Sequence, residues 1–384
     1  MRVLFTGAPA VGHLFPMVPL AWALRGAGHD VLFASYNGSE PVTRAGMPLV
    51  NIAPELDAPH ELLAVAGARR PELLKRVTDS ATADRDAFVR LYAHVNDLVA
   101  DSLVEHARDW RPDLVVFEPL ATAGVVAAAA LGVPAVQHNL GFGRNAPLRA
   151  TMLEELAGTF ARHRVSAPAA EDVQVIDIAP PSTVSVTDGW LLRPVSFSGG
   201  GTLPPWLPQR PDRPRVAVTL GTFLPHLLEP ARIRPVLEAM GKVDAEFVLA
   251  LGNTDLGPLG ELPPNIRAVG GSAWLPWNAL LRTCAASVHH GGSGSSLASM
   301  EAGLPQLVLP SVSESGTNAD AVADRGCGLR SSYQELSAEL LERVLFDDTL
   351  RAAADEVRAE IAAMPTPAEL VPRLAGLAGL GGLL

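Results

Sequence analysis

The sequence is poor in cysteine and in clustered positive charge. Cys284 and Cys327 are the only cysteines among 384 residues, so neither a disulfide framework nor a cysteine-rich metal cage is expected. The formal net charge is -11 at pH 7, and the lysines and arginines form no basic run interleaved with aromatic residues. Nucleic acid is therefore disfavoured as a partner. The scarcity of cysteine suits a reducing cytoplasm.

Long apolar runs are also absent. No uninterrupted stretch reaches the roughly 18 apolar residues that a membrane-spanning helix needs. Residues 1–5 lead directly into a strand-and-glycine pattern, unlike a signal peptide. Hydrophobic residues nevertheless make up 48% of the chain and charged residues 18%, which is enough to fill packed cores. We expect a globular cytoplasmic protein without integral membrane association, and the length suggests two domains.

Short apolar runs alternate with helix-like stretches in both halves of the chain. Buried parallel strands joined by crossover helices give this pattern. We therefore predict an α/β protein with two Rossmann-like parallel-sheet domains. The predicted strands lie at residues 3–5, 31–34, 114–117 and 135–136 in the first half, and at 215–220, 247–251, 266–269, 286–289 and 306–309 in the second.

Residues 193–214 are rich in proline and glycine, which leaves little room for a helix or a central strand. We predict an interdomain linker there; a long surface loop within one domain is the alternative. The predicted domains are then residues 1–192 and 215–364. A tail at residues 365–384 follows, in which Pro365, Pro367 and Pro372 are expected to break the chain.

Residues 289–295 read His-His-Gly-Gly-Ser-Gly-Ser, and they connect a predicted strand to a predicted helix. The first N–H groups of a helix lack internal partners, and glycine lets the backbone close on an anion. We predict a diphosphate site there, with His290 donating a ring N–H and Ser295 a hydroxyl. The glycine pattern fits neither the dinucleotide fingerprint nor the P-loop. From the turn alone, a tight structural turn is an equally good interpretation.

Several motifs occur in a recognisable order. The glycine turn lies between Trp274-Leu275-Pro276 and the pair Asn318-Ala319, with Glu301-Ala302-Gly303-Leu304-Pro305 and Pro310 in between. This order resembles the donor-binding signature of family-1 glycosyltransferases with the GT-B fold. Pro9-Ala10-x-Gly12-His13-x-x-Pro16, with Gly28-His29-Asp30-Val31, resembles the N-terminal motif of the same family. Within it, the chain is most similar to actinobacterial natural-product enzymes, which use dTDP-deoxysugars.

The resemblance implies a GT-B fold, with two Rossmann-like domains facing across a cleft. The N-terminal domain would bind the acceptor, through Gly12 and His138, and the C-terminal domain the nucleotide sugar. Trp274 and Leu275 would lie beside the base, and an aromatic side chain can stack on a pyrimidine; a core tryptophan is the alternative. The full set of donor-binding residues would be Gly221, Thr222, Trp274, Leu275, His290, Gly292, Ser293, Gly294, Ser295, Glu314 and Ser315.

His13 is the candidate general base. A neutral imidazole can take a proton from an acceptor hydroxyl as that oxygen attacks the anomeric carbon, and the resemblance gives the matching histidine this role. A histidine that caps or packs against the next helix is the structural alternative. Glu118, at the end of the strand 114–117, is the candidate carboxylate partner that orients the base. Many relatives carry Asp at that place, and a solvated loop Glu is the alternative.

Two residues depart from the family pattern. Where the family usually has Asp-Gln, which binds sugar hydroxyls, this chain has Glu314-Ser315. The loss of one amide suits a donor with fewer hydroxyls, which favours a deoxysugar.

The sequence as a whole predicts an inverting transferase that moves a sugar from a dTDP-sugar, its co-substrate, to a hydrophobic small molecule such as a polyketide. No cofactor and no metal ion is expected. A homodimer is left open. The rival hypotheses are a GT-B-fold nucleotide-sugar epimerase and a non-catalytic nucleotide-binding partner protein.

Overall fold

The computed structural model describes the chain except for residues 57–58, 80–83, 210, 221–229, 253–256, 258–259, 271–273, 311–312 and 381–384, and except for the side chains of residues 59–60, 79, 230–233 and 313–314. The chain divides into two compact units. Unit 1 consists of Met1–Ile178, Thr187–Arg193 and Pro365–Leu384, and unit 2 consists of Ala179–Val186 and Pro194–Met364.

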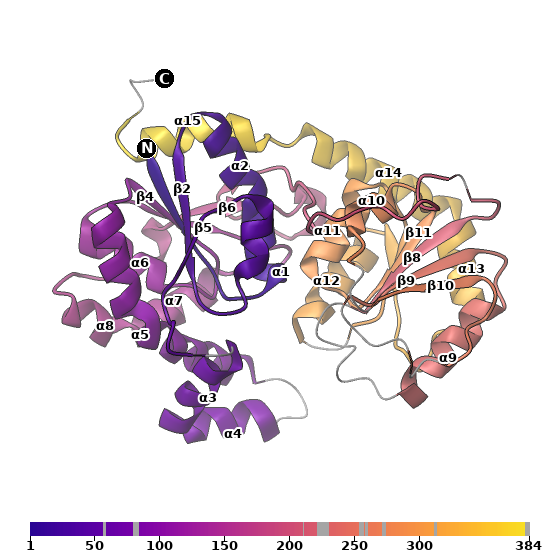
Figure 1. Ribbon diagram of the computed structural model, residues 1–384, viewed down its shortest axis with the longest axis horizontal. Helices are drawn as coiled ribbons and strands as arrows, with labels where there is room; N and C mark the ends of the chain where they lie inside the picture. The colour runs from indigo at the N-terminus through magenta and orange to yellow at the C-terminus, as the bar shows by residue number, and fades with distance from the viewer. Residues whose placement is uncertain are drawn as a thin grey trace. The chain divides into compact units, whose positions relative to one another are not determined.

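Unit 1 is built on a seven-stranded sheet in the order β3-β2-β1-β4-β5-β6-β7 (Figure 1). Each neighbouring pair is parallel. The strands are β1 (Arg2–Thr6), β2 (Asp30–Ser35), β3 (Leu49–Asn51), β4 (Leu114–Phe117), β5 (Ala135–His138), β6 (Gln174–Asp177) and β7 (Trp190–Leu191). Leu114, Val115, Val116 and Phe117 of β4 are all 0% exposed. Continuous apolar runs of this kind form strands that are covered on both faces.

In unit 1, α2 and α6 contact the sheet, whereas α3, α4 and α7 pack on the long helix α5. The helix α5 begins at Asp84, whose side chain accepts a hydrogen bond from the Ala87 amide, and buries an apolar face against α6. The helices are α1 (Val11–Leu14), α2 (Val18–Gly26), α3 (Pro59–Arg69), α4 (Pro71–Asp79), α5 (Arg85–Trp110), α6 (Ala123–Leu131), α7 (Ala146–Glu155), α8 (Ala157–Arg162) and α15 (Pro367–Leu377), with short 3-10 turns η1 (Phe15–Met17), η2 (Glu40–Ala45) and η3 (Ala170–Asp172).

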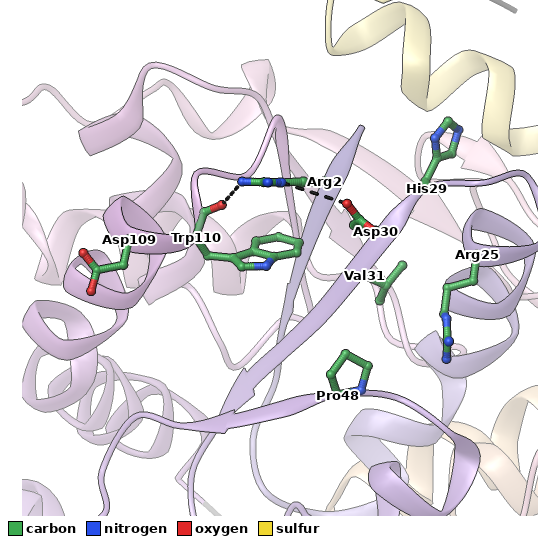
Figure 2. Close-up of a pocket in the computed structure, with 8 residues that line it drawn as sticks. All are labelled: Arg2, Arg25, His29, Asp30, Val31, Pro48, Asp109 and Trp110. Carbon is green, nitrogen blue, oxygen red and sulfur yellow. Dashed lines mark hydrogen bonds and ion pairs between the residues drawn. The ribbon is translucent and has the colours of Figure 1, made fainter.

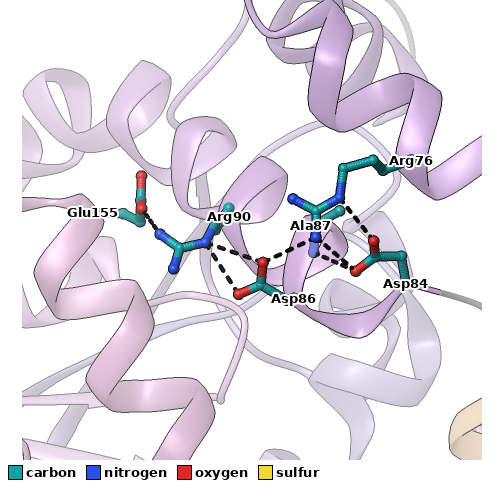
Figure 3. Close-up of polar contacts among 6 residues, drawn as sticks. All are labelled: Arg76, Asp84, Asp86, Ala87, Arg90 and Glu155. Atoms are coloured by element: carbon teal, nitrogen blue, oxygen red, sulfur yellow. Dashed lines mark hydrogen bonds and ion pairs between the residues drawn. The ribbon is translucent and has the colours of Figure 1, made fainter.

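A surface network of charges links α4, α5 and α7 (Figure 3). Arg76 of α4 pairs with Asp84 at 2.8 Å and with Asp86 at 3.2 Å. Arg90 of α5 pairs with Asp86 at 3.1 Å and also with Glu155 of α7. The network therefore connects the start of α5 to α4 and to α7.

Unit 2 repeats the architecture with a six-stranded parallel sheet in the order β10-β9-β8-β11-β12-β13. Its strands are β8 (Arg215–Thr219), β9 (Glu246–Ala250), β10 (Ile266–Val269), β11 (Ala286–His289), β12 (Gln306–Val308) and β13 (Gly328–Arg330). Its helices are α9 (Pro230–Gly241), α10 (Trp277–Leu281), α11 (Ser293–Glu301), α12 (Ser313–Asp324), α13 (Ala338–Phe346) and α14 (Asp348–Ala363), with the 3-10 turn η4 (Pro181–Thr183). The two predicted parallel sheets are both present.

The expectation that prolines break the chain after residue 364 was wrong. Residues 367–377 form α15, because Pro367 occupies the first turn, where a missing N–H costs nothing, and a capping box links Thr366 and Glu369. Pro372 lies inside the helix without ending it. The helix packs against α2 in unit 1.

The proline-rich segment after Arg193 lies against unit 2. The Ser196 amide donates to Glu301 Oε2 at 2.8 Å, and the Trp274 indole N–H donates to the Ser198 carbonyl at 2.7 Å. These contacts hold residues 196–198 beside α10 and α11. In the part of the chain that the structure describes, no helix is long and apolar enough to cross a membrane.

Candidate active site

His13 and Glu118 meet at the carboxyl end of the sheet in unit 1. His13 lies on α1, just after β1, and Glu118 directly follows β4, the neighbour of β1. His13 Nδ1 lies 3.1 Å from Glu118 Oε2. The Glu118 side chain is fully buried, whereas 23% of the His13 side chain is exposed. The structure thus brings together the two residues that the sequence proposes as base and partner; their catalytic roles stay predictions.

Backbone amides hold the Glu118 carboxylate in place. The Ala8 amide donates to Oε1 and the Leu120 amide to Oε2, each at 2.9 Å. These two bonds fix the positions of both carboxylate oxygens. Nδ1 is the ring nitrogen of His13 that lies near the carboxylate. The negative charge favours the neutral tautomer with its proton on Nδ1, which leaves the basic lone pair on Nε2. Nε2 is the nitrogen suited to take a proton from a substrate.

The turn between β1 and α1 depends on Gly7. A Cβ at Gly7 would lie 2.9 Å from Leu14 Cδ2 and 3.2 Å from Glu118 Cγ, so a side chain there would separate α1 from Glu118. The Ser35 hydroxyl donates to the Gly7 carbonyl at 2.7 Å, and Ser39 donates to Ser35 at 2.7 Å. These anchors were not predicted from the sequence; the available signal was Ser35 at the end of an apolar strand, with Ser39 four residues later.

Two tyrosines that were not predicted lie near Glu118. Tyr36 follows β2 and Tyr92 lies on α5, and their side chains are hydrogen bonded to one another. Burial and then the Glu118 charge raise the pKa of Tyr92 to about 12. Burial, with Tyr92 and Glu118 nearby, also raises the pKa of Tyr36. Both phenols are therefore neutral near pH 7. Tyr36 also lines a small, mostly apolar cavity under the Gly7 turn.

The two residues predicted to contact the acceptor differ in environment. Gly12 is exposed on α1, and a Cβ added there would meet nothing within 4 Å. His138 ends β5 and is 0% exposed, with its Nδ1 2.8 Å from the Asn139 carbonyl oxygen. Burial lowers the pKa of His138 to about 4, so it is neutral at pH 7. Gly12 is therefore accessible, whereas His138 is enclosed.

A hollow of about 460 Å³ lies elsewhere in unit 1 (Figure 2). It is at the amino ends of β1 and β2, the edge opposite His13. Arg2 donates to the Trp110 carbonyl at 2.8 Å and lies 4.0 Å from Asp30, so its charge is already engaged. This hollow is not part of the candidate site.

The glycine turn of unit 2 has the predicted strand-to-helix setting. The strand β11 ends at His289, and Gly292 is the N-cap of α11, which begins at Ser293. The first amides of α11, at Ser293, Gly294 and Ser295, therefore have no partner within the helix. Gly294 is exposed, and a Cβ added to it would meet nothing within 4 Å. An anion can approach these amides closely.

Gly291 and Asn318 fix the shape of this turn. Gly291 has a φ of +87°, and a Cβ there would lie 2.8 Å from the Ser315 carbonyl oxygen, so a larger residue is excluded. The Asn318 amide group donates to the Gly291 carbonyl at 2.7 Å and to Ser293 Oγ at 3.0 Å. The sequence motif contained Asn318, but its role as an anchor was not predicted.

The remaining donor-site predictions fall into several environments. Burial lowers the pKa of His290 to about 4, although a hydrogen bond with the Thr219 backbone acts in the opposite direction. His290 is therefore neutral at pH 7 and offers a hydrogen bond rather than a charge. Trp274 is half-buried and Leu275 belongs to an apolar cluster with Trp277. Ser315 is buried on α12. Gly221, Thr222 and the Glu314 side chain lie outside the described residues.

Among the described residues, no three His, Cys, Asp or Glu side chains gather in a way that could hold a metal ion.

Comparison with known proteins relates both units to one family. Residues 22–221 match the N-terminal domain, and residues 234–377 the C-terminal domain, of "Erythromycin biosynthesis protein CIII-like" proteins. The chain is 36% identical to the elloramycin glycosyltransferase ElmGT of Streptomyces olivaceus, over 99% of this chain and 98% of the relative. It is also 36% identical to the L-demethylnoviosyl transferase of Streptomyces niveus, over 98% of each.

Solved structures give the same relationship. The glycosyltransferase SnogD from Streptomyces nogalater superposes with a TM-score of 0.84 at 37% identity, covering 99% of both chains. The glycosyltransferase VinC, solved with dTDP, superposes with a TM-score of 0.82 at 30% identity, covering 99% of this chain and all (100%) of VinC. With matches along nearly its whole length, the chain belongs to the erythromycin biosynthesis protein CIII-like family and is a glycosyltransferase of the GT-B fold.

Proposed function

We propose that this enzyme transfers a deoxysugar from a dTDP-sugar to a hydroxyl group of a hydrophobic, polyketide-type aglycone, with inversion at the anomeric carbon. Support comes from the relatives. They include an aclacinomycin-T 2-deoxy-L-fucose transferase, 32% identical, and a spinosyn rhamnosyltransferase solved with spinosyn aglycone, 27% identical. VinC was solved with dTDP.

The 3.1 Å contact between His13 and the buried Glu118 carries the proposal. His13 Nε2 takes the proton of the acceptor hydroxyl as that oxygen bonds to the anomeric carbon. The bond from this carbon to the diphosphate oxygen breaks, and dTDP leaves with its electron pair. Glu118 stabilises the imidazolium that forms, because its charge is fixed by two backbone amides.

On the donor side, the unpartnered amides at the start of α11 bind the diphosphate, and the Ser295 hydroxyl and His290 add hydrogen bonds. The partial positive charge of a helix N-terminus stabilises the growing charge on the leaving group. We propose that these groups serve in place of a metal ion.

The test of the base is His13→Ala. Transfer should fall by at least about 100-fold, because general-base help is commonly worth 10²–10⁴ in rate. The affinity for dTDP, measured by calorimetry, should stay nearly unchanged, because His13 does not contact the nucleotide in this mechanism. Comparable turnover in the variant would remove His13 from the mechanism.

The donor is tested separately. Because Glu314-Ser315 retains a carboxylate but loses one amide, dTDP-2,6-dideoxyhexoses should be used faster than UDP-glucose. Mass spectrometry against a panel of aglycones measures this. Faster use of UDP-glucose would contradict the deoxysugar proposal, and an isomerised sugar from donor incubated alone would favour an epimerase.

A further inference from the structure

A set of buried polar groups lies between β11, β12 and α11 in unit 2. The side chains of Ser287 and His289 on β11, Gln306 on β12 and Ser299 on α11 are all 0% exposed. Ser287 Oγ donates to Ser299 Oγ at 2.8 Å, and Ser299 donates to the Ser295 carbonyl at 2.9 Å. Buried polar groups are usually hydrogen bonded, and a separate pair of bonds joins the His289 ring to Gln306 and to the Gly291 amide.

The contacts of His289 determine its tautomer. The Gly291 amide donates to Nδ1 at 3.2 Å, so Nδ1 carries a lone pair and the ring proton is on Nε2. Nε2 therefore donates to Gln306 Oε1, which is 2.8 Å away. The orientation of the Gln306 amide follows from the same argument, because its oxygen must face the ring. Burial also keeps the ring neutral, since it lowers the pKa of His289 to about 4.

Gly291 is thus held at both ends of its backbone. Its N–H is bound by His289, and its carbonyl accepts from Asn318 at 2.7 Å. Gly291 has a left-handed φ of +87°, one of several conformations that a glycine adopts without steric cost, so the two bonds select this one. The next residue, Gly292, is the N-cap of α11. The direction in which the α11 amides point therefore depends on this clamp.

We propose that His289 is a positioning residue for the donor: its Nδ1 lone pair, set by the bond to Gln306, holds Gly291 so that the first amides of α11 face the diphosphate. This inference rests on the proposed donor site at the glycine turn. It assigns to the first histidine of the pair 289–290 a role distinct from that of His290, because His289 acts through the backbone without touching the nucleotide.

Two substitutions separate the two ring nitrogens. In His289→Asn the side-chain oxygen can take the place of Nδ1, which keeps an acceptor for the Gly291 amide. In His289→Gln the longer side chain reaches the place of Nε2, which keeps a donor for Gln306 but leaves the Gly291 amide without its acceptor. The two variant side chains have similar polarity, so a difference in dTDP affinity between the variants reports on the hydrogen bond from the Gly291 amide to residue 289.

The measurement is the dissociation constant of dTDP for the full chain, by calorimetry, with the KM values for donor and acceptor and the thermal midpoint. We expect His289→Asn to bind dTDP within about threefold of the wild type and His289→Gln to bind at least about tenfold more weakly, because an unmet buried amide is costly. The donor KM should rise in parallel and kcat should fall in His289→Gln, because the same amides stabilise the leaving group, while the acceptor KM stays close to wild type.

Equal dTDP affinities in the two variants would overturn the inference. If His289→Gln does not fold, Gln306→Met replaces it, because without the Gln306 oxygen the ring proton can move to Nδ1 and oppose the Gly291 N–H. Unchanged dTDP binding in Gln306→Met would then overturn the inference, and weaker binding would support it. Absence of dTDP binding in the wild type would instead refute the proposed donor site itself. That result is distinct from a failure of the His289 proposal alone, in which the wild type still binds dTDP.

Discussion

At the scale of single residues, the negative charge of Glu118 has the most direct chemical consequence. Its two carboxylate oxygens accept from the Ala8 and Leu120 amides, and one of them lies 3.1 Å from His13 Nδ1. Glu118→Gln keeps the shape but removes the charge that stabilises an imidazolium. Since a hydrogen bond to a charged group contributes roughly 1.5–3 kcal/mol, kcat should fall about 10- to 100-fold. Steady-state kinetics at saturating substrates measure this.

The control for this prediction is nucleotide binding. Glu118 lies in unit 1, so dTDP affinity in Glu118→Gln should equal that of the wild type. Glu118→Asp should also lose activity, because the shorter side chain cannot reach His13 while keeping both backbone amides. A Glu118→Gln enzyme with wild-type kcat would show that the contact is only structural.

The pairing of His13 with Glu118 was predicted from the family resemblance, which gives the matching histidine the role of base and places Asp at the position of Glu118 in many relatives. The structure explains the pairing, because both residues follow strands that are adjacent in the parallel sheet. The clamp on Gly291 could not be predicted. It depends on which ring nitrogen of His289 faces the backbone and on the position of Gln306 on the neighbouring strand β12. Residue spacing in the sequence indicates neither. Tyr36 and Tyr92 were missed for a similar reason, since they are 56 positions apart in the numbering and only the fold brings them together.

At the scale of elements, α15 supplies a comparison within one helix. Leu374 is 0% exposed, whereas Leu377, three residues later, is 39% exposed. Leu374→Ala should lower the free energy of unfolding by about 2–5 kcal/mol, because it leaves a cavity in the core. Leu377→Ala should change it by less than about 0.5 kcal/mol. Urea unfolding of the two variants measures the difference, and equal losses would show that α15 does not pack as described.

The elements that the sequence revealed are those with long, fully buried apolar runs. The strands β1, β4 and β11 appear within one residue of their predicted limits. The strands β3, β6, β7 and β13 were not predicted. Both β3 and β7 are only half-buried, and β6 and β13 contain polar or glycine residues at both ends, so that two apolar residues remain in β6 and one in β13. The helix α15 was missed because its prolines were taken as chain breakers, although a first-turn proline is compatible with a helix.

At the scale of the whole molecule, three buried histidines make stability depend on pH. Burial lowers the pKa values of His138, His289 and His290 to about 4 each. In the unfolded chain, histidines take up protons as the pH falls through about 6.5, whereas these folded ones stay neutral until about 4. Their stabilising contribution is therefore complete above pH 6.5 and is lost as the pH falls toward 4.

At pH 5, each of these histidines should lower the free energy of unfolding by about 2 kcal/mol relative to its value at pH 7.5. Urea unfolding at pH 5, 6 and 7.5 measures the slope of the unfolding free energy against pH. His138→Asn removes one titrating group, so its slope should be shallower than that of the wild type by about one proton per molecule. Identical slopes in the two proteins would contradict the assignment.

The path of the chain has a consequence for hybrids between relatives. The chain crosses between the units four times: residues 179–186 belong to unit 2, residues 187–193 to unit 1, residues 194–364 to unit 2 and residues 365–384 to unit 1 again. A chimera joined once, near residue 193, would place the α15 of the relative on the α2 of this enzyme. A chimera joined near residues 193 and 364 keeps the native pair of α2 and α15, but it separates residues 179–186 from the rest of unit 2. Exchanging donor specificity by recombination therefore calls for a second junction near residue 364, with residues 179–186 taken from the same parent as residues 194–364.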